Sequence, residues 1–447
     1  MVGEVNFVHV VNAEGPLLET LEETFVRLEE TFGIKLAPNR ENLSKIQNGE
    51  FDLGELTSVL QEAFAPTRMD MLGSWDKIES VLEEINGSEF RDRYKDSFGQ
   101  PWLLNWFCAD HVGFEINPRH RDLGYHNIFD RYKAIVERTP QARHDSLEWH
   151  FHPVSIKREA HRCATRCFGS DEIFQVLCRR LIDREFFPRC FHAGFQGVRP
   201  DLHWFLEQFI PFDFSNFSKV DYSEYDRSLA FKNGRAGDWR GAPHDWSIYK
   251  PAHDDHRIVG NCRRFIGRCL KIRNKIGNVT QLEVDRAFQR AASGKNTLLS
   301  VFSHDWRDIR PEIDHMYDLL SIGNKKYSNV KWKHVTSLQG FRNCADIEKP
   351  SGRLDLHVEV VANEEDVPFL RVEAVSGEVF GPQPFLAIKT KSGRYIHDNF
   401  DFDNSGRVWY FPFHADTLPL SDVKFIGVAS NDYFGNQSLK VLKDLAY

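Results

Sequence analysis

The chain of 447 residues has few of the features that mark several common protein classes. It has only 8 Cys and no Cys-x-x-Cys spacing, so we expect reduced, buried thiols rather than a disulfide scaffold or a structural zinc finger. The 57 Lys and Arg residues are outnumbered by 65 Asp and Glu residues, which gives a net charge of −8, and no basic block is present. This balance argues against nucleic acid or an anionic membrane surface as a partner.

Signals for export, membrane insertion and nucleotide binding are also missing. The first basic residue is Arg27, and the apolar run 5–11 is short and interrupted by Asn6 and His9. We therefore expect neither a signal peptide nor a transmembrane helix, and a cytoplasmic protein with no membrane insertion. The chain also contains no GxGxxG, GxxxxGK[ST] or HExxH pattern.

Aromatic residues are abundant, with 36 Phe, 12 Tyr and 10 Trp. Together with 41% hydrophobic residues, they indicate a folded protein with a large core, and the length suits two or three domains. We expect most of the rings to be core, and some of them to line a sugar-binding cleft.

Up to about residue 345, short apolar runs alternate with amphipathic patterns, which favours a parallel β-sheet or barrel. Helices are predicted to begin at Pro16, Ser74, Ser170 and Thr280, where capping residues precede apolar stripes. Strands are predicted at 5–11, 147–152, 189–195 and 298–303.

The pattern changes after a predicted linker at 345–353. Apolar and polar residues alternate with a period of two from residue 354, and further short strands are predicted at 369–375, 384–390, 407–413 and 423–429. We predict an α/β barrel with helical insertions over 1–345, followed by a separate C-terminal antiparallel β-sandwich of five to eight strands over 354–447. The sandwich can bind carbohydrate, form a homo-oligomer or dock a partner, and the sequence favours none of these three roles over the others.

Polar residues lie at the ends of predicted strands, where α/β folds hold their working residues. Glu14 directly follows the first predicted strand. It is a candidate metal ligand or base, or it is an acid that stabilises the positive end of the helix beginning at Pro16. His150 and His152 are two residues apart, so on a strand they project from one face. They suit a divalent metal such as zinc completed by a carboxylate, or they form a surface pair.

His304 directly follows the predicted strand 298–303. It is a candidate general acid, with Asp305 or Asp308 setting its orientation and pKa, or it only caps the next turn. One metal centre and one acid are together the set that hydrolysis of an amide or ester needs.

In their order along the chain, these segments resemble the motifs of the polysaccharide-deacetylase (NodB-homology) family. The resemblance covers most of residues 5–310 and rests on Glu14-Gly15-Pro16, the His150/His152 pair, Phe191 to Gly194 with Pro211 to Ser215, and Leu299 to His304. It implies a deformed (β/α) barrel and removal of N-acetyl groups from amino sugars or polysaccharides, here in bacterial O-antigen or capsule metabolism. It also implies a divalent metal on Glu14, His150 and His152, with His304 as the catalytic acid.

The chain departs from the family pattern at three places. Asn12 stands where the family has its Asp base, the two metal histidines are two rather than four residues apart, and His192 replaces a common Arg. Asp110 is a candidate substitute base, as is Glu14 itself with a different metal set. Further candidate substrate-binding residues are Asn12, Trp149, Arg119, His192 and Arg240. The two arginines belong to segments rich in Arg, Asp and aromatic residues. These segments either bind a charged or nucleotide-linked sugar or are ordinary loops held by salt bridges.

Three functions remain open from the sequence. The first is a metal-dependent hydrolase of an amide-bearing sugar. The second is a non-catalytic glycan-binding or assembly protein that kept the barrel and lost the base at Asn12. The third is an acyl- or amidino-group transferase acting on the same sugars.

Overall fold

The computed structural model describes residues 2–160, 162–164, 167, 171–220, 236–273, 278–362, 367–443 and 445. Within these residues, seven parallel strands close a barrel in the order β1-β2-β3-β4-β5-β6-β7, and β8 lies beside the amino end of β1. The strands are β1 (Val5–Ala13), β2 (Leu104–Cys108), β3 (Ser146–Phe151), β4 (Cys190–Ala193), β5 (Phe212–Asn216), β6 (Phe265–Lys271), β7 (Thr297–His304) and β8 (Trp332–His334). The predicted α/β barrel is therefore confirmed.

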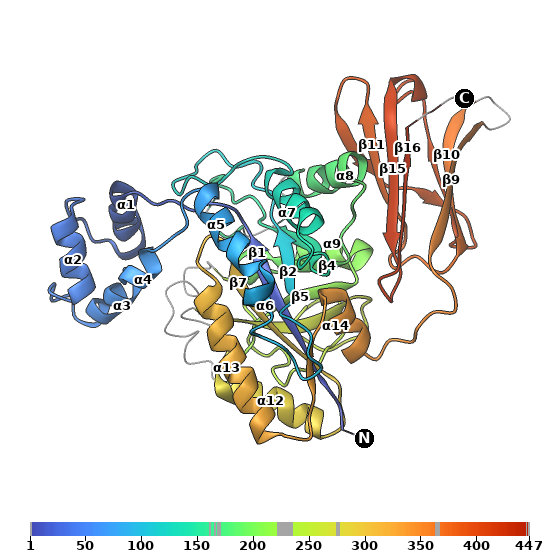
Figure 1. Cartoon of the computed structure of the whole chain (residues 1–447). Coiled ribbons are helices and arrows are strands. Elements are labelled where there is room, and N and C mark those ends of the chain that lie inside the picture. Colours follow the sequence, from blue (N-terminus) through green and yellow to red (C-terminus); the bar gives the residue numbers. More distant parts are fainter. Residues whose placement is uncertain are drawn as a thin grey trace.

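Helices connect the strands and cover the barrel (Figure 1). The side chains of Ser74 and Thr280 cap their helices as predicted, but the helix expected from Pro16 begins at Leu21, because Thr20 and Glu23 form a capping box there. Ser170 lies outside the described residues. The helices are α1 (Leu21–Phe32), α2 (Arg40–Asn48), α3 (Glu55–Ala63), α4 (Pro66–Met69), α5 (Trp75–Ile85), α6 (Ser88–Arg91), α7 (Asn127–Arg138), α8 (Glu172–Arg184), α9 (Pro200–Phe209), α12 (Gln281–Ala292), α13 (Arg310–Lys326) and α14 (Ser337–Cys344).

Helices α1 to α4 form a small group beside the barrel, inserted between β1 and β2 (Figure 1). They have an apolar core of their own, made by Phe25, Leu28, Ile46, Leu60 and Phe64. No helix among the described residues is both long and apolar enough to cross a membrane.

The predicted C-terminal β-sandwich is also present, as two four-stranded antiparallel sheets in the orders β13-β14-β10-β9 and β12-β11-β15-β16. The second sheet packs on α8, where Asp183 accepts hydrogen bonds from Lys389 and Tyr395. Phe385 and Ala429 of this sheet belong to the same apolar core as the barrel, so the sandwich is docked rather than apart. Its strands are β9 (Asp355–Ala362), β10 (Pro368–Ser376), β11 (Phe385–Thr390), β12 (Tyr395–Asp398), β13 (Asp401–Phe402), β14 (Val408–Pro412), β15 (Val423–Asn431) and β16 (Gln437–Leu442).

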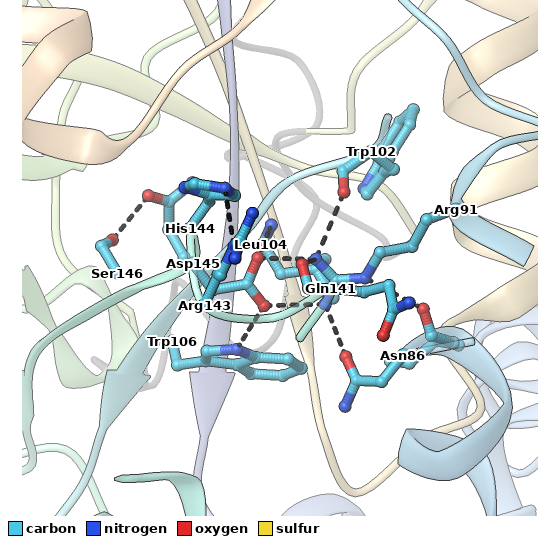
Figure 2. A network of polar contacts seen from close by, with 12 residues as sticks. Asn86, Arg91, Trp102, Leu104, Trp106, Gln141, Arg143, His144, Asp145 and Ser146 are labelled. Carbon is cyan, nitrogen blue, oxygen red and sulfur yellow. Dashed lines mark hydrogen bonds and ion pairs between the residues drawn. The ribbon is translucent and has the colours of Figure 1, made fainter. Parts of the chain in front are cut away.

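A buried ion pair between Arg91 of α6 and Asp145, which directly precedes β3, lies at the amino ends of β2 and β3 (Figure 2). Arg91 binds Asp145 through both carboxylate oxygens, each at 2.7 Å. The same carboxylate accepts hydrogen bonds from the main-chain N–H of Leu104 at 3.1 Å and the indole N–H of Trp106 at 3.0 Å. Because the strands are parallel, this network lies at the opposite end of the barrel from their carboxyl ends.

His9 lies on β1, buried on the face that carries Phe7 and Val11 and points away from the barrel interior, and is held in its neutral form. The indole of Trp102 donates to His9 Nδ1 at 3.1 Å, so the proton of His9 is on Nε2, which donates to the Ser303 hydroxyl at 2.6 Å. This tautomer prevents His9 from taking the Ser303 proton, so the pair is not a nucleophile and base. Burial, with a contribution from His334, lowers the pKa of His9 to about 3.

This pKa predicts sensitivity to acid. The unfolded chain binds a proton at His9 below about pH 6.5 and the folded chain does not, so the free energy of unfolding falls as the pH falls from 6.5 towards 3. The contribution of His9 approaches about 1.4 kcal/mol per pH unit. Urea unfolding between pH 7 and 4.5 measures it, and His9→Gln is expected to show a shallower dependence than the parent chain. An equal slope in both proteins would contradict the assignment.

Candidate metal centre

One acid and two histidines meet at the carboxyl ends of the barrel strands. Glu14 directly follows β1, His150 lies near the end of β3, and His152 directly follows that strand. The Nε2 atoms of His150 and His152 lie 3.2 and 3.3 Å from Glu14 Oε1, and 2.8 Å from each other. Ligands bound at ~2.0–2.1 Å in a tetrahedral zinc site are about 3.3 Å apart. The three atoms are therefore spaced as ligands of one ion.

The partners of these side chains leave the ligand atoms available. The Nδ1–H of His150 donates to the main-chain oxygen of His192 at 2.7 Å, which places the Nε2 lone pair towards Glu14. Arg121 binds the second oxygen of Glu14 at 2.6 Å, and His111 contacts its main-chain oxygen at 2.9 Å. Such outer partners are the usual supports of a metal ligand set.

The charge states also suit a cation. Burial alone would raise the pKa of Glu14, but Arg121 and His152 outweigh it and hold this pKa well below its ordinary value. Burial lowers the pKa of His152, although Glu14 opposes the shift. At neutral pH the site thus offers a carboxylate and a neutral imidazole, the forms that bind metal. The residues present fit a divalent metal.

Asp305 holds Glu14 in place. Its carboxylate accepts hydrogen bonds from the main-chain N–H groups of Glu14 and Gly15 and from the Tyr132 hydroxyl, each at 2.8 Å. Burial raises the pKa of Asp305 to about 7. We predicted that this side chain, or Asp308, orients His304. The structure instead bonds Asp305 to the turn that carries Glu14 and pairs Asp308 with Arg310.

His304 lies beside the three ligand residues, at the end of β7. Its Nε2 atom is 3.7 Å from Glu14 Oε1, and its side chain is 19% exposed. It lines a cavity of about 270 Å³ together with Glu14, His150 and His152. Burial lowers the pKa of His304 well below its ordinary value, although Glu14 opposes this shift. An imidazole therefore faces the space next to the candidate metal.

Asn12 also faces this cavity. The Nδ1–H of His192 donates to Asn12 Oδ1 at 2.7 Å, which fixes the orientation of the amide. The Asn12 Nδ2 atom is buried and has no hydrogen-bond partner among the described residues. Since buried donors are nearly always paired, this amide is available to an oxygen atom of a ligand. His192 supports Asn12 and does not itself line the cavity.

The other predicted site residues are placed as follows. Arg119 lines the cavity and is paired with Glu19 at 2.7 Å. Asp110, Trp149 and Arg240 lie outside the cavity lining. The Asp110 carboxylate binds Arg180 at 2.7 Å and accepts a hydrogen bond from the main-chain N–H of His126. Trp149 packs against Phe191 and Phe205 in the core, and Arg240 is paired with Asp238.

Several residues of the cavity were missed. They are Lys271 at the end of β6, Arg273, Arg307 and Glu312. Arg121, the partner of Glu14, also lines the cavity, and it belongs to the segment 117–122 that was predicted to suit a charged or nucleotide-linked sugar. The rule that strand ends hold working residues would have found Lys271 if the strand 265–271 had been predicted. Arg307 follows His304 by three residues, and its position gave no separate signal.

No family model matches the chain, and no match is found among the curated proteins or the solved structures.

Proposed function

We propose that the protein is a metal-dependent hydrolase that removes an N-acyl group, such as acetyl, from an amino sugar in bacterial surface-polysaccharide metabolism. The observation that carries this proposal is the meeting of Glu14, His150 and His152 at one point, with His304 beside them in one cavity. Zinc suits a donor set of two histidines and a carboxylate. The order of the motifs along the chain supports a barrel of the NodB type and a sugar amide as substrate.

The residues divide the work of amide hydrolysis between them. A divalent metal on Glu14, His150 and His152 would activate water and polarise the acyl oxygen. His304 accepts a proton from the attacking water and passes it to the leaving nitrogen, because a single imidazole carries protons in both directions. This use of His304 removes the need for a carboxylate at Asn12, whose free amide N–H instead donates to an oxygen of the substrate.

Asn12 also favours a second candidate function. If no base replaces the missing carboxylate, the same cavity binds a sugar and leaves it unchanged. Release of acetate from N-acetylated amino sugars by the parent protein would exclude this alternative. Binding without turnover would support it.

Metal analysis tests the ligand assignment. We expect the purified protein to hold a stoichiometric divalent metal, and His150→Ala to lose it on dialysis. Loss of an outer partner of a ligand typically weakens metal affinity ~10–100-fold, so the loss of a ligand is expected to exceed this range. His357→Ala, which removes a half-exposed histidine of β9, is the matched control and should keep its metal. Unchanged metal content in His150→Ala would refute the assigned site.

A further inference from the structure

Three cationic side chains lie in the cavity of the candidate metal centre. They are Lys271, Arg273 and Arg307, which we call the cationic cluster. Arg119 and Arg121 line the same cavity, but Glu19 and Glu14 neutralise them. The cationic cluster is faced by one further acid of the lining, Glu312, whose pKa burial raises to about 7. The cavity is therefore positive in a chain whose net charge is −8.

Two members of the cluster lie against aromatic rings that are neighbours of His304. Lys271 pairs in register with Phe302 on the neighbouring strand, and its Nζ atom is 5.4 Å from the centre of the Phe302 ring. That ring lies 5.7 Å from the His304 ring. The Arg307 guanidinium is 4.7 Å from the centre of the Trp306 ring, which lies 4.9 Å from the His304 ring. An anion between these cations would lie next to the reacting group.

The positive charges of the cationic cluster are not neutralised by ion pairs with the described residues. None of the three forms an ion pair with a carboxylate of the described residues, and Arg307 Nε is buried without a hydrogen-bond partner. Burial and the nearby Arg307 lower the pKa of Lys271 to about 8, and Glu14 and Glu312 oppose this shift only in part. Arg273 is exposed and Lys271 and Arg307 are partly buried, and cations that line one cavity without carboxylate partners favour the binding of an anion there. Elsewhere in this barrel the buried arginines are paired, as Arg268 is with Glu283.

We propose that the cationic cluster binds a phosphoryl group of the substrate, so that the protein acts on a phosphorylated or nucleotide-linked amino sugar. A phosphoryl group carries up to two negative charges and three acceptor oxygens, which suits three cations that are opposed by one weak acid. A carboxylate group of a ligand would neutralise only one of the positive charges of the cationic cluster. This inference rests on the proposed function for the sugar, but the anion site itself does not require catalysis.

Calorimetry with inorganic phosphate and with N-acetylglucosamine 6-phosphate tests the anion site. We expect both to bind the parent protein, and Lys271→Met and Arg307→Met each to weaken binding about 10- to 100-fold, the range of a charge-assisted hydrogen bond. Lys331→Met removes an exposed lysine outside the cavity and is the matched control. Because Lys271 forms no ion pair with a carboxylate of the described residues, its replacement is expected to leave the Tm unchanged or higher, whereas loss of a structural cation would lower it.

The outcomes separate the two proposals. Phosphate binding that depends on Lys271 and Arg307 but persists in His150→Ala supports the anion site, even if no acetate is ever released. Hydrolysis of unphosphorylated N-acetylglucosamine with no measurable phosphate binding would overturn the anion site and leave the proposed function intact. Acetate ion binding as tightly as phosphate would overturn the assignment to a phosphoryl group.

Discussion

Replacing Asp145 by alanine is expected to lower the free energy of unfolding by about 3–5 kcal/mol, the usual cost of removing one partner of a buried ion pair. Asp145 and Arg91 are both buried, and their side chains are 0% and 3% exposed. Without the carboxylate, the guanidinium of Arg91 stays in the core as an uncompensated charge (Figure 2). The Leu104 N–H and the Trp106 indole lose their acceptor at the same time.

Urea unfolding of the parent and variant proteins measures this effect. Asp308→Ala is the matched control, because its partner Arg310 is partly exposed, and such pairs contribute ~0–1 kcal/mol. In the double variant Arg91→Met/Asp145→Leu we expect part of the stability to return, since no unpaired charge remains. Metal content should be unchanged, because the pair lies at the amino end of the barrel. A loss below about 1 kcal/mol in Asp145→Ala would show that the pair does not hold β2 and β3 together.

The part of the fold that could be predicted is the part with simple periodicity. β1, β3 and β7 are apolar runs, and β9 and β10 alternate with a period of two, so each was found within a few residues of its observed bounds. The strand β6 was missed because buried Arg268 interrupts its apolar run. Its charge is neutralised by Glu283 of α12, a partner that lies on another element and cannot be identified from local pattern.

In the candidate site, too, the residues that follow a local pattern could be predicted, and those that depend on contacts between distant segments could not. The alternation of a strand was sufficient to place His150 and His152 on one face, and the strand-end rule selected Glu14 and His304. The role of Asp305 could not be predicted, because it depends on β7 lying beside β1 in a register that brings its carboxylate to the Glu14 main chain. Contacts between residues almost 300 positions apart follow from the closure of the barrel.

His304→Ala is expected to lower kcat by ~10²–10⁴-fold, the range over which a positioned acid–base group acts, while metal content stays that of the parent. The separation is possible because His304 lies 3.7 Å from Glu14 Oε1 and outside the set of three ligand residues. The readout is acetate release from the N-acetylated sugar that the parent protein hydrolyses, together with metal analysis of the same samples. His150→Ala should lose both the metal and the activity.

Chemical rescue distinguishes proton transfer from a structural role of the side chain. Added imidazole fits into the space left in His304→Ala and should restore part of kcat, because it supplies the missing proton carrier in the same cavity. His304→Gln keeps polar volume without a titrating group, so it should stay slow and resist rescue. Equal activity of the parent and His304→Ala would mean that a group other than His304 carries the proton. No activity in either protein would favour the alternative of a protein that binds its sugar without turnover.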